Sequence, residues 1–151
     1  MKFLVGSDHA GLSLKRQLIE RLRAQSVDVV DVGTDSAASC DYPDFALAVA
    51  RGVAAGEADF GLLCCGTGQG MAMTANRVPG VRAAVVADTF TARSTREHND
   101  ANVLCLGERV VGAGLAGDIL DLFRTTPFAG GRHQGRVSKI NALDGAKAAR
   151  S

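Results

Sequence analysis

The sequence is poor in aromatic residues, with no tryptophan and only 5% Phe, Trp and Tyr among its 151 residues. It has no hydrophobic run near the roughly 20 residues that span a bilayer, and residues 1–6 lack the long apolar stretch and cleavage site of a signal peptide. Neither sign of charge dominates, since 17 Lys and Arg face 16 Asp and Glu. A nucleic-acid-binding surface is therefore not expected. We expect a cytoplasmic domain that binds neither nucleic acid nor membrane.

Motifs for metal and disulfide bonding are also missing. The four cysteines, Cys40, Cys64, Cys65 and Cys105, show no CxxC spacing, so reduced thiols are expected rather than disulfides. No His-x-His or HExxH motif is present, and the cysteines are not spaced as zinc ligands. The sequence therefore predicts neither a metal site nor a cofactor.

Apolar residues make up 46% of the chain, and 18 glycines accompany them. Short apolar runs alternate with helical patterns, and the last helix is expected at about 137–149. The runs that predict strands are 2–6, 27–32, 60–64, 81–86 and 103–106. Strands that are each followed by a helix are typical of a parallel sheet covered on both faces. We predict one domain, residues 1–151, with an α/β fold: a doubly wound, Rossmann-like three-layer sandwich around a five-stranded parallel sheet.

Ligands of such folds bind beyond the carboxyl ends of the strands, so the segments that follow strands are the candidates for chemistry. The first is Gly6–Gly11, which contains Asp8 and His9. It is not a Walker loop, because Leu12 stands where a phosphate-binding lysine is needed. Asp8 either caps the helix that follows or contacts a small ligand together with His9.

The second candidate is Cys65–Gly70, a glycine-rich turn between a strand and a helix. Its glycines lack the spacing of a dinucleotide site, and no acidic residue follows at the required place. Its N–H groups instead suit an anion or a developing oxyanion. A thiol at this position favours the thiolate. Cys64 points to the opposite side of the strand and is expected in the core.

Two further segments are rich in His and Arg. His98 and Asn99 end a predicted helix, where a histidine is often only a favourable partner of the helix dipole. Arg132 and Arg136 flank His133 in a predicted loop, which could be a solvated basic patch. Guanidinium groups also match phosphate in geometry, and histidine suits proton transfer near neutral pH.

Five segments, in order along nearly the whole chain, together resemble type B ribose-5-phosphate isomerases of the ribose/galactose-6-phosphate isomerase family. They are Gly6–Gly11, Asp41–Asp44, Cys65–Gly70, His98–Val103 and Gly130–Gln134. The resemblance implies a metal-independent aldose–ketose isomerase of the pentose phosphate pathway that interconverts D-ribose 5-phosphate and D-ribulose 5-phosphate through a cis-enediolate. It also implies a homodimer, or a dimer of dimers, with active sites between subunits. We expect the last helix to pack on the partner, because a chain with small-residue helices and few aromatics gains by burying surface in a dimer.

The resemblance assigns roles at the matching positions. It implies that Cys65 moves the proton between C2 and C1, and that His98, assisted by Thr67 and Asp8, opens the furanose ring. It implies that Asn99 and the loop amides hold the enediolate; the loop residues are Gly66, Thr67, Gly68, Gln69 and Gly70. The remaining substrate-binding residues that it implies are Tyr42, which lines the pocket, and His9, Arg109, Arg132 and Arg136, which bind phosphate.

Two other functions stay open on the sequence. One is isomerisation of a six-carbon sugar phosphate, such as allose 6-phosphate or galactose 6-phosphate, which the pocket volume near Tyr42 and the loop 36–41 would decide. The pair His98-Asn99 favours the pentose, because galactose 6-phosphate members of the family tend to lose it. The other is a non-enzymatic phosphate- or nucleotide-binding module of flavodoxin-like shape, which would have no need of Cys65.

Overall fold

The computed structural model describes residues 1–148, with side chains described as far as Asp144. Its centre is a five-stranded, all-parallel sheet in the order β2-β1-β3-β5-β4. The strands are β1 (Lys2–Ser7), β2 (Asp28–Asp31), β3 (Phe60–Cys65), β4 (Ala83–Val85) and β5 (Val103–Gly107). The predicted α/β sandwich with a five-stranded parallel sheet is confirmed.

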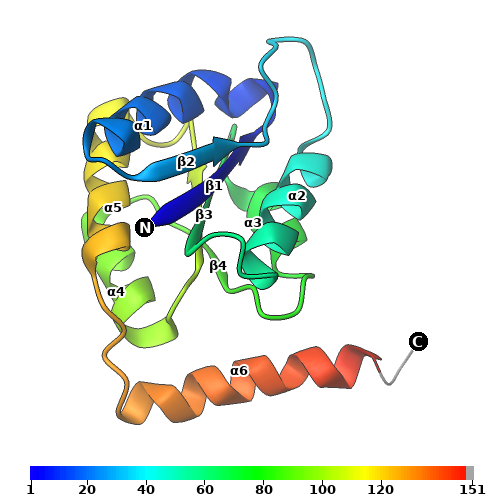
Figure 1. The fold of residues 1–151 in the computed structure, drawn as a ribbon, viewed down its shortest axis with the longest axis vertical. Helices are drawn as coiled ribbons and strands as arrows, with labels where there is room; N and C mark the ends of the chain where they lie inside the picture. Colours follow the sequence, from blue (N-terminus) through cyan, green and yellow to red (C-terminus); the bar gives the residue numbers. More distant parts are fainter. Residues whose placement is uncertain (149–151) are drawn as a thin grey trace.

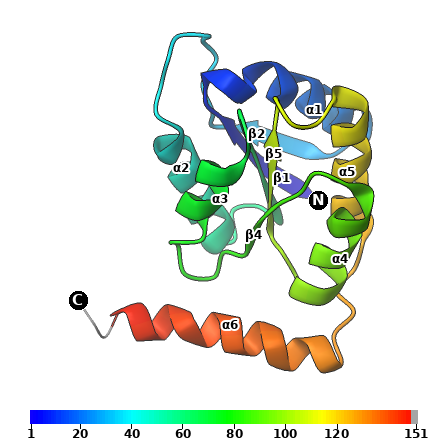
Figure 2. The ribbon, with the colours of Figure 1, turned by 180° about the vertical axis from the view of Figure 1, so that it is seen from behind.

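Helices cover both faces of this sheet (Figures 1 and 2). They are α1 (Leu12–Ala24), α2 (Tyr42–Ala54), α3 (Gln69–Ala75), α4 (Thr89–Asn99), α5 (Ala113–Thr125) and α6 (Arg132–Ala148), with a short 3₁₀ helix, η1 (His9–Gly11), before α1. One core cluster joins the sheet to α1, α4 and α5, and a second joins it to α2 and α3. In the first cluster Leu14, Leu18 and Leu22 form the buried stripe of α1, as their spacing predicts.

The sheet has two edges that matter for function. Because all strands run in parallel, the turns after β1, β3 and β5 gather at the carboxyl edge, and each helix returns the chain to the opposite, amino edge. The register aligns Ser7 with Cys64 and Cys65 with Gly107 at the carboxyl edge. Figure 1 shows α6 lying across the amino edge, away from the long β2–α2 loop.

Two predicted helix starts were wrong. The last helix begins at Arg132 rather than at 137, so the supposed basic loop forms its first turn. Gly130 and Gly131 both have positive φ, and their carbonyl groups accept the N–H groups of His133 and Gln134, which starts the helix there. Similarly, α3 begins at Gln69 rather than at Met71.

The helix α6 contacts its own chain through polar groups. Asp144 accepts the N–H of Gly80 at 2.8 Å, and Asn141 accepts a hydrogen bond from Arg82 at 3.1 Å. The expected packing of this helix on a partner subunit stays a prediction, and residue 149 of its expected range lies outside the described residues. Among residues 1–148, no helix is both long and apolar enough to cross a membrane.

Candidate active site

The turn after β1 is packed directly on the end of β3. A Cβ on Gly11 would lie 2.4 Å from the carbonyl carbon of Cys64, so only glycine allows η1 to approach so closely. The side chain of Asp8 is buried, and its Oδ1 accepts the N–H groups of Ala10 and Gly11 at 3.0 and 3.1 Å. Asp8 thus caps η1, and the packing of Gly11 holds this turn beside Cys65.

The two neighbouring cysteines face opposite sides of the sheet, as strand alternation predicts. Cys64 is fully buried in the cluster under α1 and α5, where burial raises the pKa of its thiol well above the ordinary value. Burial likewise raises the pKa of Cys105, on β5. Cys65 lies in the other cluster and is 6% exposed at the end of β3. Only Cys65 of this pair is placed to meet a ligand at the carboxyl edge.

The loop after Cys65 folds back on its own thiol. Gly68 has φ +80°, a left-handed conformation that suits glycine, and its N–H donates to Cys65 Sγ at 3.1 Å. Gln69 N–H donates to Thr67 Oγ1 at 3.4 Å. Two backbone hydrogen bonds hold the loop against the segment after β5. Glu108 N–H donates to the Cys65 carbonyl at 2.9 Å, and Arg109 N–H donates to the Gly66 carbonyl at 3.1 Å. The thiol therefore has an amide donor and a rigid surrounding loop.

Three further predicted residues lie at this edge. The Tyr42 ring, at the start of α2, lies against Gly70: a Cβ there would be 2.5 Å from the ring. The exposed side chain of Arg109 lies along Gly66, within 3.7 Å of where a Cβ would stand. His9 accepts the N–H of Cys40 on Nδ1 at 3.2 Å. The carboxyl edge thus gathers five of the predicted side chains, namely Asp8, His9, Tyr42, Cys65 and Arg109.

His98 lies at the other edge of the sheet, because α4 runs back from the end of β4 to the start of β5. The guanidinium of Arg96, in the last turn of α4, stacks over the Phe60 ring at the beginning of β3, 4.8 Å from its centroid. The His98 ring stacks on His133 of α6, with centroids 4.3 Å apart and planes at 13°. Asn99 is exposed beside them.

His133 is nearly buried, whereas its neighbours Arg132 and Arg136 are exposed on the first turns of α6. Burial lowers the pKa of His133, and the positive charges of His98, Arg132 and Arg136 lower it further, while Glu97 opposes them. The imidazole of His133 is thus held toward its neutral form under the His98 ring.

The predicted site residues therefore form two groups rather than one. Asp8, His9, Tyr42, Arg109 and the loop Cys65–Gly70 share the carboxyl edge. His98, Asn99, Arg132 and Arg136 share the amino edge, about 13 Å away along the strands by the register of β3 and β5. The segments of Asp8, Cys65 and Arg109 directly follow strands, whereas both His- and Arg-rich segments of the second group lie on helices at the amino edge.

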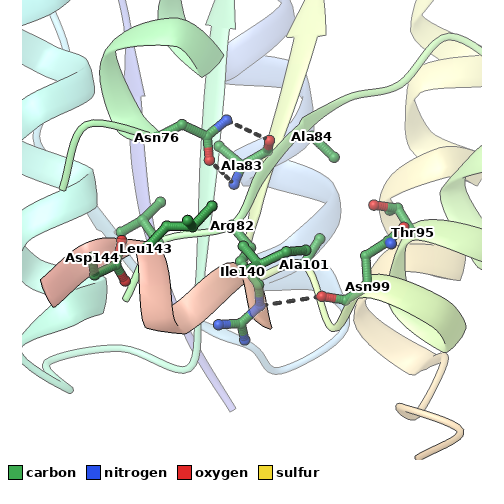
Figure 3. Close-up of a pocket in the computed structure, with 11 residues that line it drawn as sticks. Asn76, Arg82, Ala83, Ala84, Thr95, Asn99, Ala101, Ile140, Leu143 and Asp144 are labelled. Atoms are coloured by element: carbon green, nitrogen blue, oxygen red, sulfur yellow. Dashed lines mark hydrogen bonds between the residues drawn. The ribbon is translucent and has the colours of Figure 1, made fainter. Parts of the chain in front are cut away.

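A cavity of about 400 Å³ opens at the amino edge between α6, β4 and α4 (Figure 3). Ile140 and Leu143 line it from α6, and Arg82 reaches across its floor to donate to the Asn99 carbonyl at 3.2 Å. No residue of the carboxyl-edge group lines it. A smaller cavity of about 310 Å³ lies beside His9 at the carboxyl edge. Within the part of the chain that the structure describes, no cluster of three His, Cys, Asp or Glu could hold a metal ion.

Two residues at the carboxyl edge escaped sequence reasoning. Glu108 accepts the N–H of Leu14 at 2.9 Å and so ties the segment after β5 to the start of α1. Lys15 is almost fully buried beneath the β2–α2 loop. The sequence does indicate that Lys15 is buried, because position 15 falls on the same helical face as Leu18, Ile19 and Leu22.

Comparison with known proteins covers nearly the whole chain. The profile of the Ribose/Galactose Isomerase family matches residues 3–140. Ribose-5-phosphate isomerase B of Escherichia coli (strain K12) is 45% identical over 95% of this chain and 96% of its own. The structure of ribose-5-phosphate isomerase B from Clostridium thermocellum superposes with a TM-score of 0.96, at 50% identity over 97% of this chain and 99% of that one. The Mycoplasma genitalium ribose-5-phosphate isomerase B, solved with bound ribulose-5-phosphate, gives a TM-score of 0.92 at 44% identity over 95% and 96% of the two chains.

Proposed function

The chain belongs to the ribose/galactose isomerase family, whose members isomerise sugar phosphates, and we propose on this premise that it interconverts D-ribose 5-phosphate and D-ribulose 5-phosphate through a cis-enediolate. The observation that carries the proposal is the position of Cys65. Its thiol lies at the edge where parallel sheets bind ligands, accepts an amide N–H, and borders a glycine-rich loop suited to an oxyanion.

Cys65 is the proposed base. In the open-chain sugar it takes the proton from one of the carbons C1 and C2 and returns it to the other, which leaves an enediolate between the two steps. Amides of Gly66–Gly70 and the Asn99 side chain of a second subunit are proposed to hold the enediolate oxygens. Each such donor typically contributes about 2.7–4 kcal/mol of transition-state stabilisation. Met71, the residue after the loop, offers no carboxylate as an alternative base.

The ring must open before this step, because only the open-chain α-hydroxy carbonyl has an acidic C–H. We assign ring opening to His98 of one subunit, with Thr67 and Asp8 of the other subunit assisting, because these residues lie at opposite edges of one chain. Its stacking on His133 gives the His98 ring a defined orientation. Histidine transfers protons well near neutral pH, which suits a group acting at the ring oxygen.

Four side chains are proposed to bind the phosphate: His9 and Arg109 from the carboxyl edge, and Arg132 and Arg136 from the amino edge. The two groups are too far apart within one chain to meet the same small substrate. The proposed enzyme is therefore a homodimer in which the amino edge of one subunit completes the carboxyl-edge site of its partner. The presence of half of the phosphate ligands on each edge supports this arrangement.

Substrate choice can be tested with a panel of aldose phosphates in the presence of EDTA. We expect the highest kcat/KM for ribose 5-phosphate and no loss on chelation. A clear preference for allose 6-phosphate or galactose 6-phosphate would replace the pentose with a six-carbon sugar. Tight binding of the panel without turnover would instead favour the phosphate-binding module.

A further inference from the structure

Lys15 is a buried ammonium group that the proposed mechanism does not use. Its side chain is 1% exposed, and its Nζ lies 2.9 and 2.8 Å from the two carboxylate oxygens of Asp31 and 2.6 Å from the carbonyl oxygen of Thr34. These acceptors match the three N–H donors of an ammonium group. Burying such a charge is costly unless it is paired, so these contacts fix where Asp31 and Thr34 lie.

Asp31 ends β2, and Thr34 lies near the beginning of the β2–α2 loop, residues 32–41, which Figure 1 shows rising above the carboxyl edge. Thr34 N–H donates to the Ser7 carbonyl at 3.1 Å, which docks the loop on the end of β1. Further along, Thr34 Oγ1 accepts the N–H of Ser36 at 3.2 Å, and Ser36 Oγ accepts the N–H of Ala38 at 3.1 Å. These side-chain turns give the exposed loop a defined path from the Lys15 anchor towards Cys40.

The loop ends on His9. Cys40 N–H donates to His9 Nδ1 at 3.2 Å, and the Cys40 sulfur lies 3.9 Å from the same nitrogen. A neutral imidazole that accepts on Nδ1 carries its proton on Nε2. The loop therefore selects the tautomer of His9 and directs Nε2–H as a donor, the form that a phosphate oxygen can accept.

We propose that Lys15 is a positioning residue for phosphate binding: by anchoring the β2–α2 loop, it holds the Cys40 amide on His9 and so fixes the tautomer and orientation of that imidazole. The role of His9 toward phosphate rests on the proposed function. The link from Lys15 to His9 does not, and it can be measured without any turnover.

The first measurement is the tautomer of His9, read from the ¹⁵N shifts of its ring nitrogens at about pH 8, where an ordinary imidazole is neutral. A His9→Gln variant assigns the signals. We expect a single Nε2–H tautomer in the unaltered protein and an averaged mixture in Lys15→Met. Leu18→Ala is the matched control, because Leu18 is also buried on α1 but makes no bond to the loop, and it should leave the His9 signals in place.

Lys15→Met also removes a buried ion pair, so a second variant tests the same link without touching the core. Ser36 is exposed, and Ser36→Ala deletes only the hydrogen bond from the Ala38 N–H to Ser36 Oγ. It should move the His9 signals in the same direction as Lys15→Met, by a smaller amount. Unchanged signals in both loop-releasing variants, or an equal shift in Leu18→Ala, would overturn the proposal.

The second measurement is kinetic. We expect Lys15→Met to raise KM for ribose 5-phosphate about tenfold with kcat little changed, the factor that follows from weakening one hydrogen bond to an anion. In a His9→Gln background the same substitution should change KM less than about twofold, because the group through which it acts is gone. An undiminished effect in that background would refute a path through His9. A protein without isomerase activity would refute the proposed function and leave the NMR result to decide the role of Lys15.

Discussion

Two inactive variants of this chain are expected to restore activity when they are mixed. Cys65→Ala removes the proposed base at the carboxyl edge, and His98→Asn removes the proposed ring-opening group at the amino edge. The register of β3 and β5 puts about 13 Å of strand between these levels, whereas a general acid or base must come within about 3 Å of its proton. Cys65 and His98 of one chain therefore cannot act on the same sugar.

The size of the recovery follows from symmetry. Random association of equal amounts of the two variants makes about half of the dimers mixed, and each mixed dimer has one site with neither substitution and one site with both. The mixture should then reach about a quarter of the activity of the unaltered protein, and purified mixed dimers about half, while each variant alone loses roughly 10²–10⁴-fold through its missing acid–base group.

The assay needs chains that have exchanged. Co-expression with two different affinity tags and sequential purification yields mixed dimers, whose turnover of ribose 5-phosphate is then compared with that of each parent. Mixing Cys65→Ala with Arg109→Ala is the control, because both changes lie at the carboxyl edge and every mixed site keeps a defect. Purified Cys65→Ala/His98→Asn mixed dimers that stay as inactive as their parents would refute a site shared between two subunits.

Three other outcomes are expected. Cys65→Ala should abolish incorporation of solvent deuterium into ribulose 5-phosphate, whereas Cys64→Ala should keep turnover and lower the free energy of unfolding by about 1–2 kcal/mol, as measured by urea denaturation. Arg132→Ala and Arg136→Ala should each raise KM for ribose 5-phosphate about 10–100-fold, with far less effect on free ribose, because each loses a charge-assisted hydrogen bond to phosphate; equal effects on both sugars would contradict this. Because the pKa of His133 is lowered in the folded protein, the unfolded chain binds a proton at this residue more readily. The free energy of unfolding should therefore fall as the pH drops below the ordinary histidine pKa. His133→Gln should make this fall smaller, as measured by thermal unfolding between about pH 7.5 and pH 5.

The fold was predictable because its signals are local. Apolar runs of strand length and the stripe of Leu14, Leu18 and Leu22 report burial directly. The opposite placement of Cys64 and Cys65 follows from strand alternation alone. The start of α6 was missed because residues 132–136 are polar and glycine-bordered, and only the backbone geometry of Gly130 and Gly131 shows that they begin the helix.

The split of the site was harder to predict, because it depends on where each helix ends in space. Only the helix α4 separates His98 from the preceding strand, β4. This helix is long enough to place His98 at the opposite edge of the sheet. Lys15 was overlooked for another reason. A lysine within an apolar stripe can extend its ammonium group to solvent, and its buried contacts with Asp31 and Thr34 become visible only when the loop is folded over it.

Exposed apolar side chains occur at both edges of the sheet, next to the two groups of site residues. At the carboxyl edge Phe90 and Val110 are 77% and 57% exposed, at the beginning of α4 and after β5. At the amino edge Leu143 of α6 is 61% exposed. Exposed apolar groups that flank polar site residues mark surfaces that proteins cover. A two-fold contact that sets the carboxyl edge of each subunit on the amino edge of the other would bury both sets at once. The same contact would bring His98, Arg132 and Arg136 of one subunit to Cys65 of the other, so burial of apolar surface and completion of the site would be a single event.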